Sequence, residues 1–220
     1  MQAMGIVHAI GKFKPVKQVV FHSKKKDIVW YAEKNTRRLD ILHDCITTKR
    51  TFEHFEIKRP SRIMSKQLLP LFEAIKMKLD NVDNVALVAG HFPTEIGLFY
   101  HCKDCDHKVV AVDHSFCHNL STAEQQFVLA HELAHAAKDH IKQFRAFQDS
   151  TLEEKKKISH AQEHEADEEA VRALGTLEGA LEFFRNWKER NKNSPTHPSH
   201  KDRVEKLLQL QNQDKKLAST

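Results

Sequence analysis

One short stretch limits the folds open to this chain more than any other feature. From Phe127 to Ala137 every residue is apolar except His131, Glu132 and His135. A segment that is apolar on nearly every side is typical of a helix buried all round. Burying two imidazoles and a carboxylate in such a helix is costly unless another group pairs with them. A metal ion would be such a partner, so the stretch predicts a metal site inside a helical core.

The spacing of these three residues fits catalysis as well as metal binding. Residues four apart lie on the same helix face, so His131 and His135 can both reach one ion. Zinc accepts imidazole and carboxylate ligands, and a catalytic zinc keeps one position for water. Glu132 lies about 100° round the helix from His131, beside the ion, where a general base belongs. The alternative, two core histidines beside a chance glutamate, is disfavoured by the apolar setting.

A third protein ligand is expected from the acidic segment between Gln162 and Asp167. Glu163 follows His135 at a distance that suits a loop and a returning helix. If Glu163 binds the ion, Asp167 lies one turn further on and can accept a hydrogen bond from a ligating imidazole. Spacing alone leaves two alternatives open, with Glu165 as the ligand or with the segment as a solvated acidic face.

Local patterns predict an α+β fold, with a small and mostly antiparallel sheet packed on the central helix and further helices after it. The central helix is expected from Thr122 to about Phe144, because Ser121-Thr-Ala-Glu124 is a capping box. Glu95 to His101 and Lys108 to Val112 flank a polar turn and predict an antiparallel hairpin. The other predictions are a strand at Val85 to Ala89 and helices at Pro60 to Leu79 with a kink or break at Pro70, Ile158 to Leu174, Leu177 to Glu189 and Lys201 to Leu210.

The length of the chain suits one domain with its own core. We expect residues 59–212 to form this domain and residues 213–220 to be a frayed tail. Residues 1–58 are expected to be an N-terminal extension, whose role stays open between extra packing and a cover over a substrate site.

Composition limits the classes of protein to which the chain can belong. Hydrophobic residues make up 40% and charged residues 30%, which is typical of a soluble globular protein. No apolar run approaches the roughly 18 residues of a membrane span, and the N-terminus has no secretory signal. Four cysteines are too few for a disulfide scaffold and favour a reducing, cytoplasmic location. The net charge of +5 is mild, so we expect no nucleic-acid partner.

The pair Cys102 and Cys105 raises the question of a second metal. It would be half of a zinc site, and Cys117, His114 and His118 would have to complete it. The simpler interpretation, a polar hairpin turn with reduced thiols, is preferred.

Three ordered motifs give the chain a resemblance to one family of metallopeptidases. They are His131-Glu-Leu-Ala-His135, Glu163-His-Glu-Ala-Asp167 and Thr196-His-Pro-Ser-His-Lys-Asp-Arg203. They resemble the motifs of the gluzincin family that contains the CAAX prenyl endoprotease and the HtpX and Oma-type proteases. The resemblance covers about residues 84–210, and it is to the small soluble "minigluzincin" form, since no membrane span is present.

The resemblance implies a zincin-like fold and a single catalytic Zn²⁺ ion. His131, His135 and Glu163 would be its ligands, and Glu132 would be the general base that accepts a proton from water. The implied activity is that of a zinc-dependent endopeptidase, a hydrolase of peptide bonds.

The same resemblance gives roles to residues around the ion. Asp167 would support a ligand, His197 would contact the substrate or the transition state, and Arg203 would position Asp167 or the substrate. His140 matches a frequent histidine of the family and is interpreted as structural. A peptide would add as an extended strand to a sheet edge at residues 107–113.

The sequence departs from the family at one place, and it leaves two alternative functions open. Ile96-Gly97-Leu98 stands where many members carry an Asn-Ala pair that binds substrate. The first alternative is a regulatory metallopeptidase of the ImmA/IrrE type acting on one repressor, against which Asp167 and the His-Pro-Ser element argue. The second is a latent or inactive zinc-binding module, which would have no need of Glu132. Neither the oligomeric state nor the natural substrate follows from the sequence.

Overall fold

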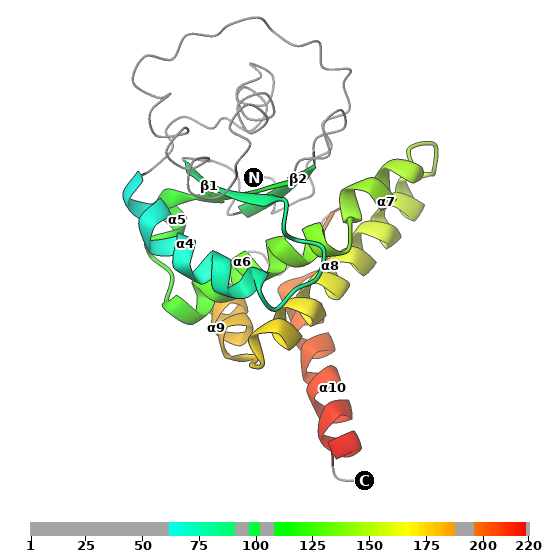
Figure 1. Cartoon of the computed structure of the whole chain (residues 1–220). Coiled ribbons are helices and arrows are strands. Elements are labelled where there is room, and N and C mark those ends of the chain that lie inside the picture. Colours follow the sequence, from blue (N-terminus) through cyan, green and yellow to red (C-terminus); the bar gives the residue numbers. More distant parts are fainter. Residues whose placement is uncertain (1–61, 91–96, 102–107, 188–195, 219–220) are drawn as a thin grey trace, which may run out of the picture.

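The computed structural model of the chain describes residues 62–90, 97–101, 108–187 and 196–218 (Figure 1). The expected extension at residues 1–58 and the pair Cys102 and Cys105 lie outside these ranges. Among the described residues, no helix is both long enough and apolar enough to cross a bilayer.

A three-stranded sheet forms one layer of the described chain, in the order β1-β3-β2. Its strands are β1 (Val85–Gly90), β2 (Gly97–His101) and β3 (Lys108–Asp113). β2 pairs antiparallel with β3, as the predicted hairpin requires, but β1 pairs parallel with β3. The sheet is therefore mixed, and the prediction of a mostly antiparallel sheet is wrong. The sheet edge expected at residues 107–113 is wrong too, because β3 is the central strand.

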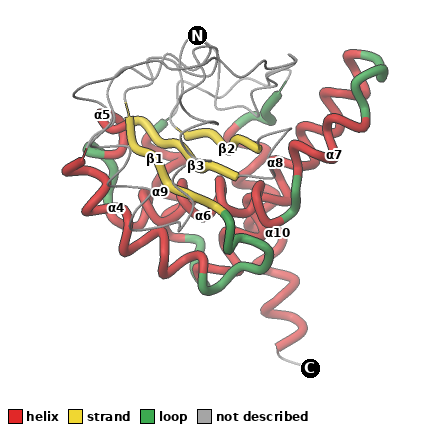
Figure 2. Tube along the Cα trace, turned by 45° about the horizontal axis from the view of Figure 1, so that its top comes forward, coloured by secondary structure: helices red, strands yellow, loops and turns green. Residues whose placement is uncertain are grey.

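Helices form the second layer, and the described helices lie on one face of the sheet (Figure 2). The helices are α4 (Arg62–Lys76), α5 (His114–Cys117), α6 (Thr122–Ala137), α7 (His140–Ala146), α8 (Leu152–Leu174), α9 (Glu178–Asn186) and α10 (His200–Ala218). α6 packs against β2, β3, α4, α8 and α9, so it is the centre of the domain. An α-rich α+β fold is thus what the chain forms.

The core lies on both sides of α6 and explains its apolar sequence. Leu133 belongs to the same buried core as the sheet residues Leu87, Phe99 and Val110, and Phe127 contacts the aromatic side chains of α9. His131, Glu132 and His135 are buried in the same helix. The predicted burial of α6 on nearly every side is confirmed.

Helix boundaries follow local signals where capping residues are present. The capping box of Ser121 and Glu124 starts α6 as predicted, and Gly175 ends α8 in the left-handed conformation with φ 71°. α8 starts earlier than predicted, because Thr151 and Glu154 form a second capping box. Its first turns are polar because they are largely exposed.

Three other helices differ from their predicted extents. α6 ends at Ala137 rather than near Phe144, because Asp139 adopts a left-handed conformation (φ 57°) before α7 begins. α4 runs through Pro70 as one helix. α10 continues to Ala218, well beyond Leu210, and Figure 1 shows it projecting away from the sheet past α8 and α9.

Gly179 allows α9 to approach α6 closely, and this contact gives a testable prediction. A Cβ atom at Gly179 would overlap the backbone carbonyl of Ala123 in α6. The variant Gly179→Ala should therefore lose about 1–3 kcal/mol of unfolding free energy, as overpacked sites do. Denaturant unfolding followed by circular dichroism measures the loss.

Gly175→Ala is the comparison for this variant. No atom lies within 4 Å of a Cβ at Gly175, so only its left-handed backbone opposes alanine, at a cost of about 1 kcal/mol. If Gly179→Ala were as stable as the parent, the close approach of α9 to α6 would be wrong.

Candidate metal centre

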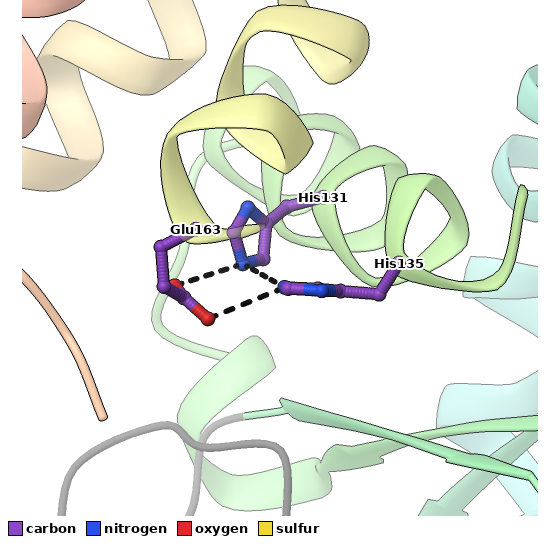
Figure 3. A group of neighbouring side chains, drawn as sticks. All are labelled: His131, His135 and Glu163. Atoms are coloured by element: carbon purple, nitrogen blue, oxygen red, sulfur yellow. Dashed lines mark hydrogen bonds and ion pairs between the residues drawn. The ribbon is translucent and has the colours of Figure 1, made fainter. Parts of the chain in front are cut away.

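Three buried side chains from two helices converge at one point (Figure 3). His131 and His135 project from α6, and their Nε2 atoms lie 3.1 Å apart. Glu163 projects from α8, with one oxygen 3.4 Å from His131 Nε2 and the other 3.3 Å from His135 Nε2. One ligand atom from each residue lies within 4.8 Å of the others, so the cluster could hold a metal ion.

The pairing of these atoms supports the fit of an ion. Oε2 of Glu163 is buried without a well-directed hydrogen bond, and its neighbours Nε2 of His131 and Nη1 of Arg203 lie 3.4 and 3.3 Å away. A buried carboxylate oxygen held only by such long contacts is incompletely compensated, and a cation at the cluster would add a direct partner. Two imidazoles and one carboxylate also form a ligand set that zinc accepts.

On the side of its ring away from Glu163, His131 contacts a second carboxylate. Its Nδ1 atom lies 3.0 Å from Oδ1 of Asp167, one turn after Glu163 on α8. Nδ1–H of His131 can therefore donate to Asp167 while Nε2 faces Glu163. This is the contact that the spacing of Glu163 and Asp167 predicts.

Arg203 on α10 contacts the carboxylates of both Asp167 and Glu163 on α8. Its Nε and Nη2 atoms donate to the two oxygens of Asp167 at 2.7 and 2.6 Å. Its Nη1 atom lies 3.3 Å from Oε2 of Glu163, and its guanidinium stacks 4.8 Å from the ring centre of Phe184. The side chain is only 2% exposed, so these contacts are made out of water.

His135 contacts an imidazole where His131 contacts a carboxylate, and the sequence did not indicate this contact. Its Nδ1 atom lies 2.8 Å from Nδ1 of His140, whose Nε2 atom lies 3.3 Å from Oε2 of Glu165. Glu165, the rival ligand in the sequence, thus lies outside the metal cluster. The sequence prediction missed this contact because it continued the helix through Asp139, whose left-handed backbone turns the chain between the two histidines.

Glu132 and His197 each interact with residues of the cluster. Glu132 is buried under β2, where a Cβ atom at Gly97 would lie 3.1 Å from its Oε1 atom. Nε2 of His197 lies 3.4 Å from Oε1 of Glu163, and its Nδ1 is 2.8 Å from Oγ1 of Thr196. The seven residues predicted for the site are therefore brought together by α6, α8 and the segment at the start of α10.

Burial and neighbouring charges separate the pKa values of these groups. Burial raises the pKa of Glu132 to about 7, although the charge of His131 opposes it. Burial works against the low pKa of Glu163, but His197, His131, His135 and Arg203 hold it well below its usual range. Glu163 is therefore ionised, and Glu132 can exchange a proton near neutral pH.

The pKa values of the histidines around the cluster also differ from one another. Burial lowers the pKa values of His140 and His197 to about 3, and it also lowers the pKa of His135. For His131 the hydrogen bonds to Asp167 and Glu163 outweigh burial and raise its pKa to about 9.

The described residues contain no second cluster of potential metal ligands. Cys117 is buried in the core, and burial raises the pKa of its thiol to about 12. A thiol with so high a pKa is a poor ligand, since metals bind the thiolate. Cys117 is therefore a core residue.

Neither models of protein families, nor curated proteins, nor solved structures yield a match to this chain. The resemblance to gluzincins therefore depends on the three sequence motifs alone.

These pKa values predict how the stability of the metal-free chain depends on pH. Below pH 6.5 the unfolded chain binds protons that folded His140 and His197 exclude, so stability falls as the pH falls. Glu132 opposes this trend between about pH 4.5 and 7, but His135, whose pKa is also lowered, acts in the same direction as His140 and His197 and the trend persists. Between pH 6.5 and 9 folded His131 retains a proton that the unfolded chain has lost, so stability falls as the pH rises.

The expected result is a maximum of unfolding free energy near pH 6.5, measured by urea titration in the presence of a chelator. Each group that binds its proton in only one of the folded and unfolded states contributes about 1.4 kcal/mol per pH unit to the slope of the unfolding free energy. The variant His131→Gln should lose the decline on the alkaline side. A decline that persists in this variant would contradict the high pKa of His131.

The cluster also predicts metal-dependent stability. Zinc that binds only the folded chain should add about 2.7 kcal/mol at a free concentration one hundred times its Kd. The variant Glu163→Gln should lose this gain and bind less than one ion per chain by elemental analysis. Glu168→Gln, on the same helix but outside the cluster, is the matched control and should retain both. Equal metal binding by the two variants would exclude Glu163 as a ligand.

Proposed function

We propose that the chain is a zinc-dependent endopeptidase of the gluzincin type. The observation that carries the proposal is Glu132, a carboxylate with a pKa near 7 buried beside the cluster of His131, His135 and Glu163. A site that only holds a metal for stability has no need of such a group. A general base is most effective when its pKa lies near the working pH.

In the proposed reaction, Glu132 and His197 beside the cluster each carry one role. A zinc ion bound there supplies Lewis acidity, polarising the peptide carbonyl and making water more acidic. Glu132 accepts the proton of the attacking water and later gives it to the leaving amine. His197 can donate from Nε2 to the developing oxyanion, because its Nδ1 can accept from the hydroxyl of Thr196.

The loop that carries His197 is fastened to α8, which supports this role. Oγ of Ser159 donates to the carbonyl of Thr196 at 2.7 Å. The imidazole of His197 is only 5% exposed. A donor fixed in this way costs little reorganisation during the reaction.

An extended peptide would bind along β2. Among the described residues β2 has a strand neighbour on one side only, whereas β3 has two. Gly97, the first residue of β2, lies over the carboxylate of Glu132. A peptide that adds to β2 as a further strand would therefore run past the general base.

The pairing of Asp167 with Arg203 favours the gluzincin type over the ImmA/IrrE type. The latter carries Asn in place of Asp167, and a neutral amide would leave the guanidinium of Arg203 without its ionic partner. A zinc module without activity stays the other candidate, and the following experiment distinguishes it.

The variant Glu132→Gln should keep its metal and lose at least about 100-fold in kcat on any peptide that the parent cleaves, since general base catalysis contributes that much or more. Metal content is measured by elemental analysis, and cleavage by mass spectrometry of a diverse peptide library. Glu168→Gln is the control and should retain full activity.

Two results would contradict the proposal. Undiminished cleavage by Glu132→Gln would exclude the general base. A parent protein that binds zinc and cleaves no peptide of the library would favour the inactive module.

A further inference from the structure

The break between α6 and α7 gives His140 a position that a continuous helix would not allow. Five residues separate about 140° round an α-helix, so on one helix His140 would point away from the face of His135. Instead α6 ends at Ala137, Asp139 adopts φ 57°, and α7 starts at His140. The result is the contact of 2.8 Å between the Nδ1 atoms of His135 and His140.

Proton balance fixes the direction of this contact when His135 binds a metal. The ligand atom is Nε2, which faces Glu163 and must carry no proton. A neutral imidazole then has its only proton on Nδ1, so His135 is the donor and Nδ1 of His140 is the acceptor. The proton of His140 must therefore be on Nε2, which faces Oε2 of Glu165 at 3.3 Å. The three residues form one chain of donors and acceptors that ends on a carboxylate.

The surroundings hold His140 in this orientation. Its side chain is fully buried, and its backbone carbonyl accepts from Nε2 of Gln162 on α8 at 3.1 Å. The preceding Asp139 is held to the sheet by Lys108 at 3.2 Å and His101 at 3.1 Å. Lys108 also donates to the carbonyl of Ala136 at 2.8 Å, at the end of α6. The turn that brings the two histidines together is thus tied to β2, β3 and α8.

The two ligands from α6 consequently have different supports. His131 donates directly to the buried carboxylate of Asp167. His135 is separated from Glu165 by the imidazole of His140, and the side chain of Glu165 is 51% exposed. Such partners of metal-bound histidines fix the tautomer and the ring orientation.

We propose that His140, supported by Glu165, is a positioning residue that sets the tautomer of His135 and so adjusts the metal affinity of the site. The role replaces the structural interpretation of His140 drawn from the sequence. It depends on the metal site of the proposed function and is independent of peptide hydrolysis.

The first test measures the tautomer directly in the full metal-free chain. Two-dimensional ¹H–¹⁵N NMR of ¹⁵N-histidine-labelled protein near pH 7.5 should show His135 protonated on Nδ1 and His140 on Nε2. In His140→Leu the acceptor is lost, and His135 should become a mixture of both tautomers. A parent protein with His135 protonated on Nε2 would overturn the proposal, whether or not the chain binds zinc.

The second test measures zinc affinity by competition with a chromophoric chelator. His140→Leu should weaken binding by about 10-fold or more, the range found for partners of metal-bound histidines. His140→Asn places an amide oxygen near the position of Nδ1 and should restore affinity to within a few-fold of the parent. Glu165→Ala should have a smaller effect than His140→Leu, because Glu165 acts only through His140.

Ile141→Ala controls for packing, since Ile141 is a buried neighbour on α7 without a polar group. It should lower the melting temperature and leave zinc affinity unchanged. Equal weakening by Ile141→Ala and His140→Leu, or unchanged affinity in His140→Leu, would overturn the proposal. Failure of the parent itself to bind zinc would instead remove the metal site of the proposed function, and the tautomer measurement would still decide the arrangement of His140.

Discussion

The structure depends on one buried guanidinium. Glu163 and Asp167 lie one turn apart on α8, and two carboxylates buried so close together would repel each other without a cation. Arg203 contacts both, and its absence would leave uncompensated buried charge at a cost of about 3–5 kcal/mol. With Arg203 in place, Asp167 stays ionised and orients His131, and Glu163 stays ionised toward the cluster. The packing of α10 on α8 and the arrangement of the cluster therefore depend on the same side chain, Arg203.

The parts that the sequence predicts depend on short-range geometry. The shared face of His131 and His135 follows from the helical repeat, and the start of α6 follows from a capping box. The choice of Glu163 over Glu165 required more, because both lie on the same helix and only one can face α6. The resemblance to a family made that choice, and the side chains of the structure agree with it.

The parts that the sequence does not predict depend on contacts between distant segments. The order β1-β3-β2 places a strand between two others that precede it, and no local pattern shows this. The end of α6 depends on Asp139, whose left-handed backbone is stabilised by Lys108 of β3 and His101 of β2. Ile141 and Phe144 continue the helical spacing of apolar residues beyond Asp139, so the predicted helix continued as well.

The residues of the site appear in the chain in the order α6, α8, α10, and this order has a consequence during synthesis. His131, His135 and Glu163 leave the ribosome before Arg203, the group that neutralises the carboxylates around them. Until α10 has emerged, packing α8 against α6 would bury two carboxylates without their cation, so the helices do not pack as they do in the complete structure. The cluster of His131, His135 and Glu163 can therefore form only after α10 is available, so it is among the last parts of the described fold to be completed.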